Sequence, residues 1–269
     1  MGLTRRGRSI GIALVVAIAA VAGVVVCGPL ARVRADDKAD ADAALAQVDK
    51  AIKALGEEKK LAQLQSGRCK GKMSGKVKDA DLALTCTVLW QGVDKHRIDV
   101  DIAVGGENIK GVLVLNGKSG WFKQGDNTNE LPENAVPFAR EMLYCVRLPQ
   151  LLTGLKDKAF KLKPVQETMI KDRAATGIWI VHEDHKDAGL YFDKENGLPL
   201  KSEIRLNDPQ GNEVNFEFFY SDYKEVSGVK HPTKIAVKGP VDQTAAEFEL
   251  ELSEIQLDEK TVDMDFAKP

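Results

Sequence analysis

Alternation of apolar and polar residues over residues 176–257 constrains this chain more than any other feature of its sequence. Phe216 and Phe218, for example, flank Glu217, and the neighbouring segments repeat the pattern. The apolar positions of these runs are Leu198, Leu200, Ile204, Leu206, Val214, Phe216, Phe218, Tyr220, Phe248, Leu250 and Leu252. Successive side chains of a β-strand point to opposite faces, so each run predicts a strand with one buried and one solvated face.

Short turn sequences separate these runs. Glu195-Asn196-Gly197, the segment 208–212 and Ser227-Gly228 are typical of tight turns between antiparallel strands. The second half of the chain is therefore predicted to be an antiparallel meander.

The first half has the same pattern between two helical segments. Residues 38–64 carry apolar residues at helical spacing and are interrupted at Gly56, whereas residues 132–152 form a second helical stretch that ends or kinks at Pro149. About five strands lie between the two segments, and six or seven follow the second. The prediction is one mainly β domain with α-helices, residues 36–269. Its sheet of about 11 antiparallel strands is strongly curved, and the amphipathic helices cover the concave face.

The first 35 residues are typical of a targeting segment. Arg5, Arg6 and Arg8 precede an apolar stretch at 10–26, and Val33-Arg34-Ala35 resembles a signal-peptidase site. An uncleaved membrane anchor is the second interpretation, because the stretch approaches the length of a transmembrane helix. Lipidation at Cys27 ranks third. Each interpretation places the domain outside the cytoplasm, in the periplasm or cell envelope, with membrane contact through this segment or through cargo.

Charge and cysteine content limit the other function classes. The chain has 38 Lys and Arg residues against 40 Asp and Glu residues, and this balance argues against nucleic-acid binding. An oxidising compartment favours a disulfide between Cys69 and Cys86, which lie on adjacent predicted strands, and leaves Cys145 free on a helix. The absence of a Cys-x-x-Cys motif argues against a metal site at these cysteines.

No motif indicates catalysis or a cofactor. His182-Glu183-Asp184-His185 is the one cluster that suggests a metal, but residues three apart on a strand face opposite ways, so we expect a polar turn. The sequence contains no Gly-x-Ser-x-Gly elbow and no glycine loop that opens a helix after a strand. We therefore expect a protein that is not an enzyme and that uses neither metal nor cofactor.

Two segments resemble the LolA-like superfamily of outer-membrane lipoprotein-sorting proteins. They are residues 190–199, LYFDKENGLP, and residues 220–232, YSDYKEVSGVKHP; the closing Glu254-Ile255-Gln256-Leu257, Phe266 and Pro269 fit the same pattern. The resemblance follows the order of elements from residue 38 to the end. It implies a half-barrel of antiparallel strands with helices as a lid, whose concave apolar face holds acyl chains.

The function expected from this resemblance is carriage of a lipid or lipoprotein acyl chain. The alternative is a ligand-free protein-interaction or sensor domain with a filled core, held at the membrane by its N-terminal helix and bound to an envelope protein. Strand parity turns the candidate cleft residues toward the helices. They are Ile98, Val100, Ile102, Leu113, Leu115, Phe138, Met142, Phe216, Phe218, Leu250 and Leu252.

Overall fold

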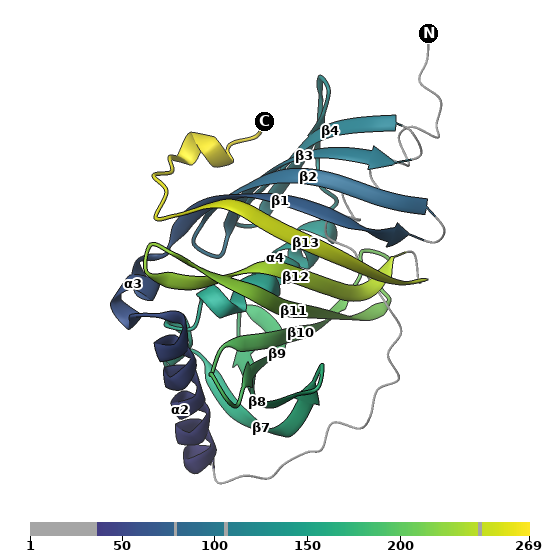
Figure 1. Cartoon of the computed structure of the whole chain (residues 1–269). Coiled ribbons are helices and arrows are strands. Elements are labelled where there is room, and N and C mark those ends of the chain that lie inside the picture. Colours follow the sequence, from purple (N-terminus) through teal and green to yellow (C-terminus); the bar gives the residue numbers. More distant parts are fainter. Residues whose placement is uncertain (1–36, 78–79, 105–106, 242–243) are drawn as a thin grey trace.

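The computed structural model describes residues 37–77, 80–104, 107–241 and 244–269. Its strands form a single 13-stranded sheet in the order β6-β5-β4-β3-β2-β1-β13-β12-β11-β10-β9-β8-β7 (Figure 1). The strands are β1 (Ser66–Val77), β2 (Ala80–Gln91), β3 (Lys95–Val104), β4 (Glu107–Asn116), β5 (Ser119–Gln124), β6 (Asn127–Glu130), β7 (Lys161–Ile170), β8 (Arg173–His182), β9 (His185–Asp193), β10 (Pro199–Asn207), β11 (Glu213–Val226), β12 (Val229–Val241) and β13 (Thr244–Leu257). Neighbouring strands pair antiparallel, which confirms the predicted meander.

Over the described residues the sheet has 13 strands, against about 11 predicted. One addition is β6, whose sequence Asn-Thr-Asn-Glu contains no apolar residue and so has no alternation to detect. The sheet is curved but not closed, with β6 and β7 as its free edges. It consists of two meanders, β1–β6 and β7–β13, joined where β1 pairs with β13.

The link from β6 to β7 must cross the sheet, because these strands are its two edges. This link contains α4 (Ala135–Arg147) and the 3-10 turns η1 (Leu148–Gln150) and η2 (Gly154–Lys156). Helix α4 packs on β9 and β10 and lies behind the sheet in Figure 1. The predicted helical insert over the concave face is thus confirmed, with Pro149 just after its end.

The N-terminal helical segment is divided as predicted. Helix α2 (Asp37–Leu55) packs on β7, β8 and β12, and the short α3 (Glu58–Gln63) follows. Gly56 between them has φ +153°, and a Cβ there would lie 2.8 Å from the carbonyl oxygen of Gly228. A larger residue would therefore push α2 away from the β11–β12 turn.

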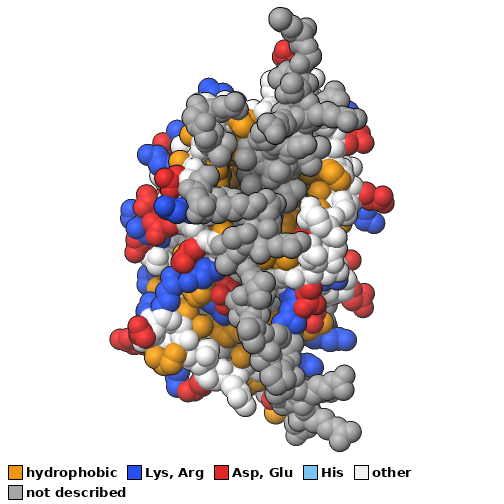
Figure 2. Space-filling model, turned by 90° about the vertical axis from the view of Figure 1, so that its right-hand side faces the viewer, with side chains coloured by type: hydrophobic (Ala, Val, Ile, Leu, Met, Phe, Trp, Pro, Cys, Tyr) orange, Lys and Arg blue, Asp and Glu red, His pale blue; other side chains and the backbone are white. Residues whose placement is uncertain are grey.

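The core lies between the inner face of the sheet and the helices. Val48, Ile52 and Leu55 of α2, Phe138 of α4 and Phe216 of β11 belong to one buried cluster. In the view turned by 90° from Figure 1, many Lys, Arg, Asp and Glu side chains lie at the margins, and patches of hydrophobic side chains are visible between them (Figure 2). A 3-10 turn, η3 (Asp263–Phe266), closes the chain against β3 and β4.

Candidate ligand-binding site

A strip of partly exposed apolar side chains runs along the inner face of β13, β1 and β2. We call these residues the apolar strip: Met73, Cys86, Val88, Leu250 and Leu252. Strand register makes them neighbours, because Leu252 and Cys86 lie on either side of Gly71, and Leu250 lies opposite Met73. They pack against the core without being closed off from solvent.

Small residues on β1 form the floor of this strip. The inner positions of β1 include Gly67, Gly71 and Gly75, and the outer positions between them are basic or polar. A Cβ at Gly71 would lie 2.9 Å from Leu250 Cδ1 and 3.0 Å from Cys86 Sγ, so these two side chains close over the glycine. The row of small inner residues in the sequence is the signal that could have located the strip.

Most of the predicted cleft residues lie elsewhere. Nine of the eleven are at most 7% exposed and belong to the core: Ile98, Val100, Ile102, Leu113, Leu115, Phe138, Met142, Phe216 and Phe218. Helix α4 packs tightly on this region, as the edge contact of Phe138 with Phe216 at 5.8 Å shows. Only Leu250 and Leu252 fall in the apolar strip, and Met73, Cys86 and Val88 are not among the predicted cleft residues.

One end of the strip is polar. Trp90 and His96 are cross-strand neighbours of β2 and β3, one step beyond Val88 along the inner face, and both are buried. The Trp90 indole lies over β1, since a Cβ at Gly67 would fall 2.1 Å from its Cζ2 atom. Arg147, the last residue of α4, places its guanidinium carbon 5.1 Å from the Trp90 ring centroid.

Arg147 is buried among neutral partners. Its Nη1 donates to the Gly92 carbonyl at 2.6 Å and lies 3.3 Å from His96 Nε2, and its Nε donates to Gln150 Oε1 at 3.4 Å. Its Nη2 has no partner among the described residues, and neither do Trp90 Nε1 and His96 Nδ1. Burial lowers the pKa of Arg147 to about 10, so it remains a cation at neutral pH.

The partners of Arg147 determine the tautomers of two histidines. Because a guanidinium can only donate, His96 Nε2 accepts and its Nδ1 carries the proton. Gln150 accepts from Arg147 through its oxygen and donates through Nε2 to His231 Nε2 at 2.8 Å, so His231 Nδ1 donates to the Pro232 carbonyl at 2.8 Å. Burial is the largest cause that lowers both histidine pKa values, to about 4 for His231 and well below the ordinary value for His96.

Two hydroxyl groups hold the end of α4 on the sheet. Ser202 Oγ of β10 donates to the Cys145 carbonyl at 2.9 Å. Tyr220 OH of β11 lies 3.2 Å from the carbonyl oxygens of Cys145 and Val146 and 2.5 Å from Ser202 Oγ. These bonds satisfy carbonyls that a helix leaves unpaired at its C-terminus. They also determine where Arg147, the next residue, reaches the sheet.

The predicted disulfide is absent. Cys69, Cys86 and Cys145 are free thiols, and Cys145 is buried on a helix as expected. Cys69 lies opposite Val88 and Cys86 lies opposite Gly71, so Cys69 and Cys86 are diagonal neighbours. Diagonal positions are about 7 Å apart, whereas a disulfide needs Cβ atoms about 3.8 Å apart. Burial raises the pKa of Cys69 to about 12 and that of Cys86 to about 11.

The histidine cluster differs from its prediction in one respect. Strand alternation predicts that His182 and His185 face opposite ways, but the tight β8–β9 turn makes them cross-strand partners with ring centroids 5.6 Å apart. His185 stacks on Tyr144 at 3.9 Å, and its Nδ1 lies 3.2 Å from Glu141 Oε1. Within the described ranges, no three His, Cys, Asp or Glu side chains are placed to hold a metal ion.

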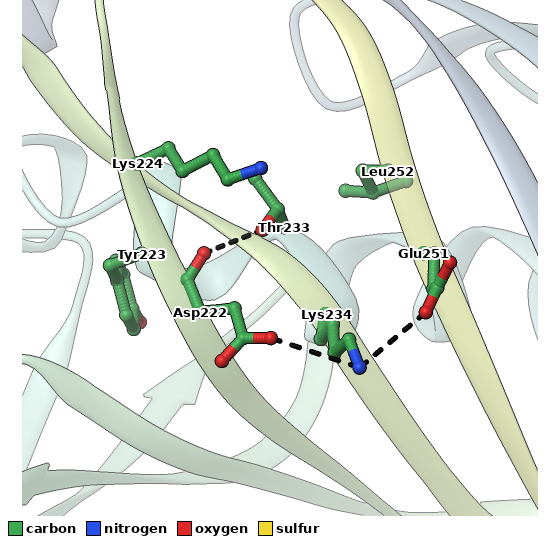
Figure 3. Close-up of a pocket in the computed structure, with 7 residues that line it drawn as sticks. All are labelled: Asp222, Tyr223, Lys224, Thr233, Lys234, Glu251 and Leu252. Carbon is green, nitrogen blue, oxygen red and sulfur yellow. Dashed lines mark hydrogen bonds and ion pairs between the residues drawn. The ribbon is translucent and has the colours of Figure 1, made fainter.

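A polar depression of about 370 Å³ lies on β11, β12 and β13 (Figure 3). The residues that line it are Asp222, Tyr223, Lys224, Thr233, Lys234, Glu251 and Leu252. Lys234 Nζ lies 3.4 Å from Glu251 and 3.8 Å from Asp222, and Thr233 Oγ1 donates to the Asp222 carbonyl at 2.6 Å. Lys234 is already paired with these carboxylates, whereas the partners of the buried Arg147 are neutral. The depression is therefore a weaker candidate for an anionic ligand than the site around Arg147.

No protein-family model and no curated protein matches the sequence. Among solved structures, a LolA superfamily protein from Nitrosomonas europaea aligns with TM-score 0.56 and 13% identity, over 84% of this chain and 97% of that chain. A DUF1329 family protein from Desulfovibrio piger aligns with TM-score 0.52 and 11% identity, over 83% and 97% of the two chains. The chain therefore has the LolA-like fold, as the resemblance predicted.

Proposed function

We propose that this chain is an exported, non-enzymatic protein of the cell envelope that binds a lipid or lipoprotein acyl chain on the apolar strip. The observation that carries the proposal is the strip itself: five contiguous, partly exposed apolar side chains on the inner face of a LolA-like sheet. Each methylene group buried there would contribute about 0.8 kcal/mol, so an acyl chain needs no polar contact along its length.

The N-terminal sequence supports export. The basic residues and the apolar stretch before residue 36 lie outside the described part of the structure, so the cleaved signal and the retained anchor both remain proposals. Among the described helices, none combines the length and the hydropathy of a transmembrane span. We propose one folded domain, residues 36–269, that follows the targeting segment.

A second candidate is a ligand-free domain that binds an envelope protein. The observation that favours it is the filled core between α4 and the strands β3, β4 and β11, where nine of the predicted cleft residues are buried. The two candidate functions differ in the molecules that should co-purify with the protein. Lipid extraction and mass spectrometry of protein purified from its native host should find stoichiometric acyl species for a carrier. Their absence, together with a co-purifying protein, would favour the interaction domain.

The apolar strip can be tested with a bulky substitution. Val88→Phe adds volume to the strip without adding charge, and we expect it to weaken binding of a fluorescent fatty acid at least tenfold because the ring occupies the path of the chain. Thr85→Phe is the matched control, since Thr85 is exposed on the same strand with the opposite parity. Binding is measured by fluorescence titration, and circular dichroism melting verifies that both variants fold.

The outcome distinguishes the two candidates. Equal loss of binding in Val88→Phe and Thr85→Phe would show that the apolar strip is not the binding surface. Lack of binding by the wild-type protein would rule out the carrier function.

A further inference from the structure

The polar end of the apolar strip contains a cation, Arg147, to which no described residue supplies a counter-charge. Arg147 is 7% exposed, and its hydrogen-bond partners are a carbonyl, an amide oxygen and an imidazole nitrogen. A buried ion without an opposite charge is costly, and proteins normally pair such groups. Among the described residues no carboxylate forms an ion pair with Arg147.

Three unsatisfied nitrogen donors belong to this end. Arg147 Nη2, Trp90 Nε1 and His96 Nδ1 each carry hydrogen and have no acceptor among the described residues. The three side chains touch one another, since Trp90 and His96 are cross-strand neighbours and Arg147 contacts both. Buried N–H groups are rarely left unpaired, so three in one cluster indicate an acceptor that the described residues do not supply.

The cluster is continuous with the strip. Val88 precedes Trp90 on the inner face of β2, and Cys69 lies opposite Val88. Burial raises the pKa of Cys69, but Arg147 is close enough for its charge to act in the opposite direction and lower that pKa. A chain lying over Met73, Cys86 and Val88 would thus end at the guanidinium. The cation at this end and the apolar strip that leads to it together indicate the kind of molecule that fits.

We propose that the ligand is a single-chain amphiphile with an anionic head group, a fatty acid, whose carboxylate binds Arg147 Nη2 beside Trp90 Nε1 and His96 Nδ1. This inference rests on the proposed carrier function and narrows its ligand class. A carboxylate offers two oxygens to a guanidinium and neighbouring N–H groups, and such charge-assisted bonds are stronger than neutral ones. These nitrogens are enclosed in this structure, so binding requires a local opening of the packing around Arg147 before the head group can reach them.

The test compares cis-parinaric acid with its methyl ester, two fluorescent probes that share one tail and differ in head-group charge. Wild-type protein should bind the acid at least tenfold more tightly than the ester at pH 8. Arg147→Met should abolish this preference while it leaves ester binding within about threefold, because the tail still has the apolar strip. Arg147→Lys, which keeps the charge, should retain part of the preference.

Arg68→Met is the matched control, because Arg68 is an exposed arginine of β1 on the outer parity. It should leave the preference unchanged. Trp90→Phe removes one donor and keeps an aromatic ring, and it should weaken acid binding by threefold or more without affecting the ester; this variant decides the question if Arg147→Met does not fold. Equal binding of acid and ester by wild type, or an unchanged preference in Arg147→Met, overturns this inference alone. Failure of wild type to bind either probe overturns the carrier function as well.

Discussion

Burial gives His231 a measurable effect on stability. The ring is 3% exposed, accepts from Gln150 and donates to the Pro232 carbonyl, an arrangement that requires the neutral form. Its pKa in the folded protein is about 4, with burial as the largest cause, against about 6.5 in an unfolded chain. As pH falls below about 6.5, His231 therefore binds a proton in the unfolded state but not in the folded state.

We expect His231→Asn to flatten the pH dependence of stability. Between pH 7.5 and pH 4, the free energy of unfolding of wild type should fall by about 3 kcal/mol more than that of the variant, since Asn can accept the Gln150 hydrogen bond but does not titrate. Urea unfolding at intervals over this range measures both slopes. Parallel slopes for the two proteins would contradict the assignment of a neutral buried ring.

Helix α4 depends on its attachment to β10 and β11. Its last carbonyls are held by Ser202 and Tyr220, and it carries Arg147 directly beyond them. The sequence predicted the helix and the Pro149 boundary, because apolar spacing and proline geometry are local properties. It did not predict the attachment, because Ser202 and Cys145 lie 57 residues apart in the chain.

We expect Tyr220→Phe to loosen the end of α4. Loss of the hydroxyl leaves the Cys145 and Val146 carbonyls with fewer donors, which should cost about 1 kcal/mol of stability and speed amide hydrogen exchange in residues 146–151. Tyr223→Phe is the control, since the Tyr223 hydroxyl donates at 2.8 Å to the Pro199 carbonyl of β10. Hydrogen exchange is measured by mass spectrometry. Equal exchange rates of residues 146–151 in the two variants would contradict the attachment.

At the scale of the molecule, pairing of β1 with β13 joins two meanders and leaves β6 and β7 as the edges. The link between these edges therefore spans the concave face. It fills the region over β3, β4 and β11 and leaves the inner face of β13, β1 and β2 partly exposed. The position of the strip is thus a consequence of topology.

The mature protein should begin at Asp36. This prediction is based on Val33-Arg34-Ala35, which resembles a signal-peptidase site and follows a basic and then an apolar segment. Intact-mass measurement of the exported protein should give the mass of residues 36–269, and soluble envelope fractions should contain it. A protein that still begins at Met1 and sediments with membranes would favour the retained anchor.

The sequence by itself determined the strands, their turns and the face that each side chain takes, because two-residue periodicity and turn chemistry act over a few neighbours. It also indicated the division of the first helical segment at Gly56, where a Cβ would meet the Gly228 carbonyl. Strand β6 escaped prediction because it has no apolar face.

Only the tertiary structure decided the contacts that depend on register and on distant segments. A two-residue offset separates Cys69 from Cys86, and a tight turn brings His182 to the same face as His185. Nine predicted cleft residues, two of them on α4 itself, are buried where α4 crosses the sheet, and no described residue supplies Arg147 with a counter-charge beside the strip. These outcomes arise from packing between segments far apart in the chain, and local residue patterns contain no information about that packing.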